Sequence, residues 1–150
     1  MRIAIASDHA AFELKAELAA ALRDWGHVVL DLGPQTTDRV DYPDFGYKLA
    51  AAIANGSAER GVALCGSGIG ISIAVNRNPA CRCALISDPY SAALAREHND
   101  ANVIAMGSRL IGTDMAKASL QSFLVGTFGG GHHGPRVEKL SHPSLAGASA

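Results

Sequence analysis

One cysteine in this chain stands directly before a run of alternating glycines. Residues 65–70 read CGSGIG, and the apolar run VAL precedes them at 62–64. A cysteine thiolate can act as a base or a nucleophile. Glycines allow positive φ angles and close approach to a ligand, and the free amides of a following helix turn favour negative charge. The segment therefore predicts a reactive thiol beside a cradle for a phosphate or a developing oxyanion.

The elements around this segment place the thiol at the edge of a sheet. Residues 61–64 predict a buried parallel strand and Ile69–Val75 predict a helix, so Cys65 falls at the carboxyl end of the strand. Open α/β sheets bind their ligands outside that end of the strands.

Three familiar loop motifs do not match the segment. The dinucleotide fingerprint G-x-G-x-x-G follows a first strand, whereas the spacing here is G-x-G-x-G in mid-chain, which argues against NAD. A nucleotide phosphate loop needs a lysine directly after its glycines, and the next lysine is Lys117. A cysteine phosphatase loop needs an arginine six positions after its cysteine, where Ile71, Ser87 and Pro89 stand after the three cysteines of this chain.

Composition narrows the class of protein. A chain of 150 residues and 15.5 kDa predicts a single domain over residues 1–150. A net charge of −1 with 18% charged residues gives no strong field for nucleic acid or an anionic membrane, so neither partner is expected. The first residues lack the pattern of a signal peptide, and no apolar stretch approaches about 20 residues, so we expect a cytoplasmic protein.

The cysteines do not suggest a disulfide or metal framework. Cys81 and Cys83 stand close together, but no second Cys/His pair is placed to complete a zinc site. We interpret these two thiols as structural and expect no metal and no cofactor.

Short apolar runs alternate with helical patterns along the chain. Leu14, Leu18 and Leu22 lie on one face of a predicted helix that Gly26 ends, and a later helix from a Thr113 cap to Gly126 is expected. Strands are expected at 2–7, 27–32, 61–64, 82–87 and 102–106. This alternation predicts an α/β fold, a three-layer α/β/α sandwich around a five-stranded parallel Rossmann-like sheet.

The end of the chain has a different pattern. Residues 127–150 predict a flexible tail that can reach beyond its own domain to a partner subunit, with a short ordered segment at Val137–Leu140. The last residues, 144–150, are small and weakly patterned, and we expect them to be frayed.

Polar residues also follow the other strands. Asp8 and His9 come after the first strand, Tyr42 stands in the loop before the second long helix, and Arg109 follows the fifth strand. The pair His98–Asn99 closes the helix after the fourth strand. In an open sheet we expect all of these residues to converge on one edge.

Several separated motifs stand in the order of a known family. The chain reads SDHA at 7–10, DYP at 41–43, CGSGIG at 65–70 with Asn76, REHND at 96–100, GSR at 107–109 and RVE at 136–138. Together they closely resemble the type B ribose-5-phosphate isomerases, and the resemblance extends to about Leu140. The wider family includes isomerases of allose 6-phosphate and galactose 6-phosphate.

The resemblance implies a cofactor-free interconversion of ribose 5-phosphate and ribulose 5-phosphate through a cis-enediolate, a step of the pentose phosphate pathway. It implies Cys65 as the base that moves a proton between C1 and C2, with Ser67 exchanging protons with the sugar oxygens and His98 opening the sugar ring. The groups that it implies around the enediolate oxygen are Gly66, Gly68, Ile69, Gly70 and Asn99.

The resemblance also implies a phosphate site and an assembly. His9, Arg109 and Arg136 would receive the phosphate, and Asp8 and Tyr42 would orient hydroxyl groups. The implied assembly is a homodimer with shared active sites, or a dimer of such dimers.

Two positions distinguish this chain within the family. Some members lack the cysteine and use a later glutamate as the base, but Cys65 is present here and Ile71 occupies that later position. His132 aligns with an arginine of the ribose phosphate enzymes, and an imidazole holds a phosphate dianion less firmly than a guanidinium does.

Other interpretations stay open on the residues alone. Cys65 can be a small buried core residue, and Asp8 can be no more than a helix cap. The sugar can be allose 6-phosphate, galactose 6-phosphate or a tetrose phosphate. The protein can also be a noncatalytic phosphosugar sensor, or one subunit of a hetero-oligomeric galactose-6-phosphate isomerase.

Overall fold

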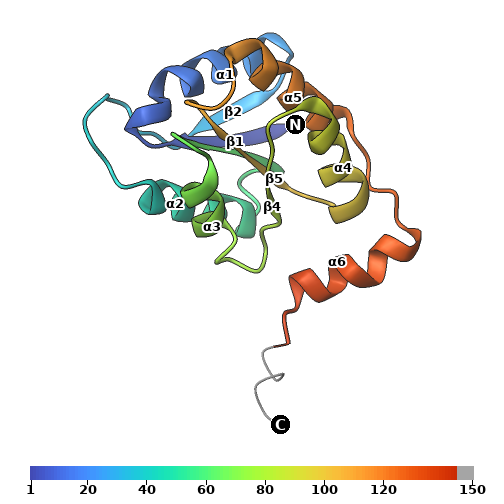
Figure 1. Ribbon diagram of the computed structural model, residues 1–150. Coiled ribbons are helices and arrows are strands. Elements are labelled where there is room, and N and C mark those ends of the chain that lie inside the picture. The colour runs from blue at the N-terminus through green and yellow to red at the C-terminus, as the bar shows by residue number, and fades with distance from the viewer. Residues whose placement is uncertain (145–150) are drawn as a thin grey trace.

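A five-stranded parallel sheet forms the centre of this structure, a computed structural model that describes residues 1–144 (Figure 1). The strands lie in the order β2-β1-β3-β5-β4, and each neighbouring pair is parallel. The order in which successive strands are added to the sheet reverses between β1 and β3, which is the point where open α/β sheets bind ligands. The strands are β1 (Arg2–Ser7), β2 (Val28–Asp31), β3 (Arg60–Cys65), β4 (Cys83–Leu85) and β5 (Val103–Gly107).

Helices cover both faces of the sheet. One face packs against α1 (Phe12–Asp24), α4 (Pro89–Asn99) and α5 (Thr113–Val125), and the other against α2 (Tyr42–Ala54) and α3 (Ile69–Val75) (Figure 1). Because both faces are covered, the central strands are apolar in their middle: in β1, Ile3 and Ile5 face the first layer and Ala4 and Ala6 the second. The expected three-layer α/β/α sandwich is confirmed.

The helix boundaries differ from expectation at two points. Tyr42 is the first residue of α2 and not a loop residue, because Asp41 takes the extended N-cap conformation and Pro43 fits the first turn. At α5 the extended N-cap residue is Gly112, so Thr113 already lies inside the helix. Among residues 1–144 no helix is both long enough and apolar enough to span a membrane.

The tail contains more helix than expected. A short turn, η2 (Gly131–His133), leads into α6 (Gly134–Ser141), which includes the short segment expected at 137–140. Figure 1 shows α6 as an arm that leaves the body of the molecule beyond α4. Of the end segment expected to be frayed, residues 145–150 lie outside the described part of the chain.

A buried ion pair fixes the point where β2 leaves the sheet. Lys15 on α1 is only 3% exposed, and its Nζ donates to both carboxylate oxygens of Asp31, at 2.7 and 2.8 Å. The same carboxylate accepts the backbone N–H of Gly33 at 2.9 Å. The pair therefore ties α1 to the start of the loop that leads to α2.

We expect Asp31→Asn to lower the free energy of unfolding by about 3 kcal/mol, because it leaves a buried ammonium group without its anion. Urea denaturation at one protein concentration measures this. The matched control is Lys117→Met, which removes an exposed ion pair with Glu17 and should cost less than about 1 kcal/mol. Equal losses of unfolding free energy in the two variants would show that the buried pair stabilises the fold no more than the exposed pair does.

Candidate active site

The Cys65 thiol lies at the carboxyl end of β3, at the reversal point of the sheet. The residue is 4% exposed, and its Sγ accepts the backbone N–H of Gly68 at 3.1 Å. Gly68 has a φ of +76°, a left-handed conformation that glycine adopts without strain, and it caps the start of α3. The glycine loop, residues 66–70, therefore curls around the sulfur.

The glycine loop packs directly on the turn that follows β5. The backbone of Ser108 donates to the carbonyl of Cys65 at 2.9 Å, and that of Arg109 donates to the carbonyl of Gly66 at 3.0 Å. A Cβ on Gly107 would lie 2.5 Å from the carbonyl carbon of Ser67, which is closer than any real side chain approaches. The absence of a side chain at position 107 thus allows the two loops to touch.

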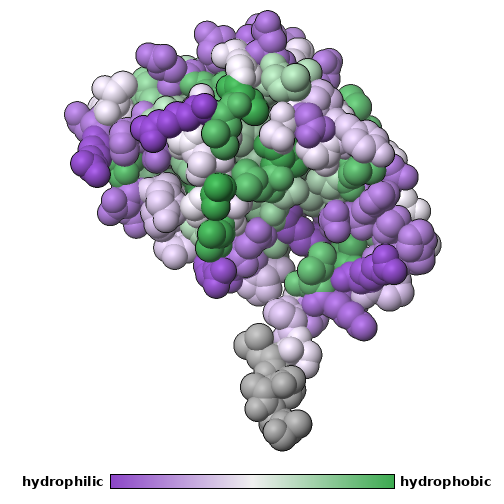
Figure 2. Space-filling view, viewed as in Figure 1, coloured by the Kyte–Doolittle hydropathy of each residue, from purple (hydrophilic) through white to green (hydrophobic). Residues whose placement is uncertain are grey.

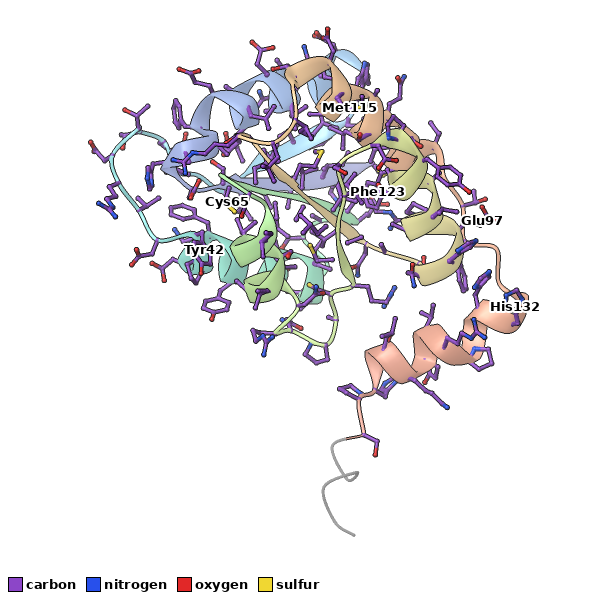
Figure 3. All side chains as sticks on the ribbon, viewed as in Figure 1. Tyr42, Cys65, Glu97, Met115, Phe123 and His132 are labelled. Atoms are coloured by element: carbon purple, nitrogen blue, oxygen red, sulfur yellow. The ribbon has the colours of Figure 1, made fainter. Side chains whose placement is uncertain are left out.

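Two side chains flank the glycine loop. The Arg109 guanidinium lies against Gly66, where a Cβ would be 3.2 Å from its Nη1. On the other side the Tyr42 ring covers Gly70, where a Cβ would be 2.6 Å from two ring carbons. Figure 3 shows Tyr42 and Cys65 on the same side of the molecule. The Arg109 guanidinium and the Tyr42 phenol therefore stand beside the glycine loop, at the edge where the sequence predicted that these residues converge.

Asp8 and His9 complete this edge of the sheet. The backbone N–H of Asp8 donates to the carbonyl of Leu64, the neighbour of the cysteine, at 3.1 Å. The Asp8 carboxylate accepts the backbone N–H of Ala11 at 3.2 Å, so it does cap the short helix η1 (His9–Ala11). The Nδ1 atom of His9 lies 3.2 Å from both the backbone N and O of Val40.

His98 and Asn99 lie at the opposite edge, and the expectation that they converge on the thiol within one chain is wrong. A helix between two parallel strands returns toward the amino end of the sheet, so α4 delivers its last residues to the start of β5. Asn99 accordingly contacts Arg82, the residue before β4, whose Nε donates to its carbonyl at 3.2 Å. The crossover rule could have revealed this from the sequence.

The end of α4 is firmly held at that edge. Asp100 takes a left-handed conformation with φ of 44°, which stops the helix. Its carboxylate accepts from Arg96 at 2.8 Å and from Arg82 at 3.1 Å. Cations at a helix carboxyl end are favourably placed, so this pairing fixes the turn that carries Asn99.

The tail contacts His98 at the end of α4. His133 stacks on the His98 ring with 4.4 Å between ring centroids, and the exposed His132 ring lies 4.0 Å from that of His133. Arg136 is exposed on α6. Figure 3 shows His132 and Glu97 on the other side of the molecule from Cys65 and Tyr42. Sequence reasoning suggested His133 only as a neighbour that compensates for the weaker charge of His132, and it gave no sign of the stack on His98, since a histidine pair beside glycines gives no periodic signal.

The predicted residues therefore form two clusters. The thiol cluster gathers at the carboxyl edge of the sheet, and the histidine cluster gathers where α4 ends and the tail begins. The thiol cluster comprises Asp8, His9, Tyr42, Cys65, residues 66–70 and Arg109, and the histidine cluster comprises His98, Asn99, His132, His133 and Arg136.

The other thiols lie away from the thiol cluster, at the start of β4. Burial raises the pKa of Cys81 to about 11, and it also raises the pKa of Cys83, to which the neighbouring Cys81 adds. Both thiols are therefore protonated at neutral pH, which fits the structural interpretation. Within residues 1–144 no three His, Cys, Asp or Glu side chains gather in a way that could hold a metal ion.

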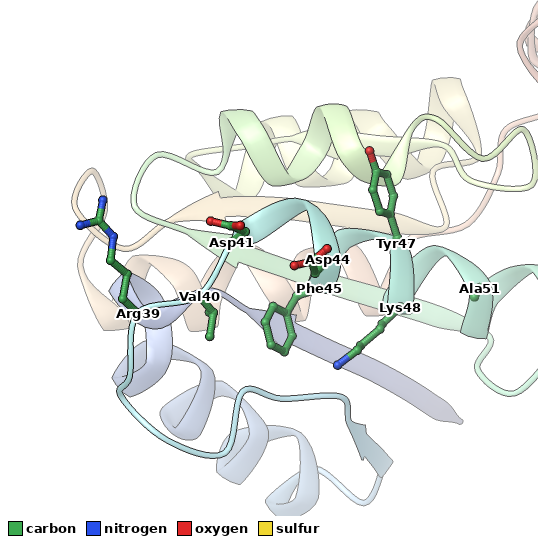
Figure 4. Close-up of a pocket in the computed structure, with 8 residues that line it drawn as sticks. All are labelled: Arg39, Val40, Asp41, Asp44, Phe45, Tyr47, Lys48 and Ala51. Carbon is green, nitrogen blue, oxygen red and sulfur yellow. The ribbon is translucent and has the colours of Figure 1, made fainter.

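An open depression lies next to the thiol cluster (Figure 4). Figure 4 shows Arg39 on the loop before α2 and Lys48 on the helix itself, with Asp41 and Asp44 between them. Cys65 does not line this depression. The charged side chains of the depression therefore border the thiol cluster and are not part of it.

Comparisons with known proteins find relatives along nearly the whole chain. The model of the Ribose/Galactose Isomerase family matches residues 3–140. The chain is 42% identical over 140 residues to the ribose-5-phosphate isomerase B of Escherichia coli, covering 93% of this chain and 94% of that relative. It is 41% identical over 143 residues to the D-erythrulose-4-phosphate isomerase of Pectobacterium atrosepticum, covering 95% and 94%.

A solved structure shows the same arrangement of elements. The ribose-5-phosphate isomerase B of Clostridium thermocellum superimposes with a TM-score of 0.93 at 45% sequence identity. The match covers 94% of this chain and 95% of that one.

The packing of the two loops gives a direct test. We expect Gly107→Ala to lower the free energy of unfolding by about 1–3 kcal/mol, because the new Cβ meets backbone that has no room to move. Gly134→Ala is the control, since its φ is −53° and a Cβ there would meet no atom within 4 Å. Urea denaturation compares the two, and similar stabilities would show that the loop contact is looser than the structure indicates.

Proposed function

The chain belongs to the ribose/galactose isomerase family and is a sugar phosphate isomerase, and we propose that its substrate pair is ribose 5-phosphate and ribulose 5-phosphate. The arrangement that carries this proposal is the Cys65 thiol enclosed by the glycine loop, with the cation of Arg109 beside it. The relatives named as ribose-5-phosphate isomerase B support the choice of sugar. The reaction would serve the pentose phosphate pathway. The family does not favour a noncatalytic sensor.

We assign the proton transfer to Cys65. Its thiolate takes the proton from C2 of the open-chain aldose, and the electron pair left behind forms the C1–C2 double bond of a cis-enediolate. Return of the proton to C1 gives the ketose, so no electrons leave the sugar and no cofactor is needed. Backbone amides of the glycine loop stabilise the enediolate oxygen, and the Ser67 hydroxyl exchanges protons with the sugar oxygens.

The remaining steps need groups that one chain keeps apart. Ring opening requires an acid–base group, which is His98, and a phosphate dianion requires several cations. Arg109 and His9 lie at the carboxyl edge of the sheet with the thiol, but His98, Asn99, His132 and Arg136 lie at the opposite edge. We therefore propose that the histidine cluster of one chain completes the thiol cluster of a second copy. A two-fold dimer builds two such sites at once.

An apolar surface lies where such a dimer would form. Ile69 and Ile73 on α3 are 50% and 52% exposed, and Leu85 on the edge strand β4 is 47% exposed. Leu85 packs on the glycine loop, where a Cβ on Gly68 would lie 2.8 Å from its Cδ1. Figure 2 shows apolar side chains gathered over α3 and β4. Burying this apolar surface favours association of two copies directly beside the glycine loop.

A shorter sugar is the second candidate. The relative from Pectobacterium atrosepticum is named for a four-carbon sugar phosphate and is as similar as the ribose enzymes. The resemblance also implies that His132 takes the place of an arginine of the ribose phosphate enzymes, which would weaken the charge for a phosphate. A substrate panel separates these possibilities.

We expect Cys65→Ala to reduce turnover about a thousandfold, because it removes the only group proposed to carry the proton. NMR in heavy water with ribose 5-phosphate follows ketose formation and deuterium at the carbon next to the carbonyl. Cys81→Ala is the matched control and should retain activity. Full turnover by Cys65→Ala would rule out its role, and turnover of tetrose or hexose phosphates but not ribose 5-phosphate would overturn the substrate.

A shared site predicts complementation between inactive chains. A purified heterodimer of Cys65→Ala with His98→Asn should show about half the wild-type turnover per dimer, because one of its two sites keeps both groups. Each variant alone should be nearly inactive.

The reverse pairing serves as the control for complementation. A heterodimer of wild type with a chain carrying both substitutions should be nearly inactive, since each site then lacks one group. If the sites lay within single chains, this second heterodimer would be the active one and the first would be silent.

A further inference from the structure

The tail lies along α4 through close contacts at two glycines. A Cβ on Gly126 would lie 2.9 Å from the Cβ of Arg96, and one on Gly129 would lie 3.3 Å from the Glu97 carbonyl oxygen. The backbone N–H of Gly129 donates to that oxygen at 2.9 Å. These contacts bring residues 127–133 against the last turns of α4.

One aromatic contact then connects the tail to the end of the helix. The His133 and His98 rings are nearly parallel, with 4.4 Å between centroids and 15° between planes. Among residues 1–144 no hydrogen bond holds the His98 imidazole, so this stack is the contact that orients it. His133 is half-buried, whereas the neighbouring His132 is exposed.

We propose that His133 is a positioning residue whose ring holds the ring of His98 and fastens the tail to α4. Because η2 and α6 follow directly, the same contact places His132 and Arg136. The ring-opening and phosphate-binding groups thus reach the partner's thiol cluster as one rigid unit. This inference rests on the proposed function for the roles of His98 and Arg136, but the docking of the tail does not.

Charges around His133 favour its neutral form. His98 and Glu97 face it from α4, and His132 and Arg136 face it from the tail. Burial lowers the pKa of His133, the basic side chains of His132, His98 and Arg136 lower it further, and Glu97 opposes them. A free imidazole binds a proton near pH 6.5, so the undocked tail takes up a proton more readily than the docked tail does. Docking is therefore unaffected at higher pH and weakens as the pH falls below about 6.5.

Two substitutions separate stacking from titration. His133→Ala removes the ring, whereas His133→Phe keeps an aromatic face that cannot bind a proton. The control is His142→Ala, which changes an exposed histidine at the end of α6 that pairs with Glu138. Hydrogen–deuterium exchange over residues 127–141 measures docking without reference to any substrate.

We expect His133→Ala to speed exchange in the tail up to about tenfold at pH 7.5, as loss of an aromatic pair would do, and His133→Phe to match wild type. Relative to the intrinsic exchange rate at each pH, protection of the tail should fall at pH 5.5 in wild type but not in His133→Phe. Exchange rates unchanged by His133→Ala, or a His133→Phe variant that resembles it, would overturn the proposal.

Kinetics test the consequence for the site. His133→Ala should lower kcat and raise KM for ribose 5-phosphate, and His133→Phe should restore both and extend activity to lower pH. Altered exchange with unchanged kinetics would limit His133 to holding the tail and would overturn its role in placing His98. If wild type turns over no sugar phosphate, the proposed function fails while the exchange experiment still decides the docking.

Discussion

The contact between the two loops that leave β3 and β5 determines most of the thiol cluster. The parallel register pairs Cys65 with Gly107, so β3 and β5 end at the same level of the sheet. Their backbones can then touch because position 107 carries no side chain, and hydrogen bonds from Ser108 and Arg109 hold the contact. A rigid sheet thereby sets the position of the thiol relative to the guanidinium, which a mobile loop could not do.

The same sheet keeps the two clusters apart. Parallel strands require each helix to run back, so groups at strand ends and groups at helix ends lie on opposite edges. Each edge of this chain collects basic side chains, with Arg109 and His9 at one and His98 and Arg136 at the other, although the net charge is only −1. The two-fold dimer that we propose would bring the two groups to one phosphate dianion.

The tail contributes two adjacent histidines, His132 and His133, to the histidine cluster. Position 132 carries an imidazole, a weaker phosphate ligand than a guanidinium, while its neighbour His133 stacks on His98. In the proposed assembly, phosphate binding and the orientation of His98 thus fall to adjacent residues of one short turn. We therefore propose that changes in this turn alter the fit of the sugar phosphate and leave the proton transfer proposed for Cys65 unchanged.

The sequence by itself determined the order of strands and helices, the parallel sheet, and the thiol before the glycine loop, because apolar periodicity and glycine spacing are local properties of the chain. It also identified the family through motifs in order, and those include every member of both clusters except His132 and His133. It did not determine which of these residues meet. Only the tertiary structure separated His98 and Asn99 from Cys65, placed Tyr42 on a helix over Gly70, and stacked His133 on His98. Such contacts join segments far apart in sequence, and the packing of helices on the sheet decides them.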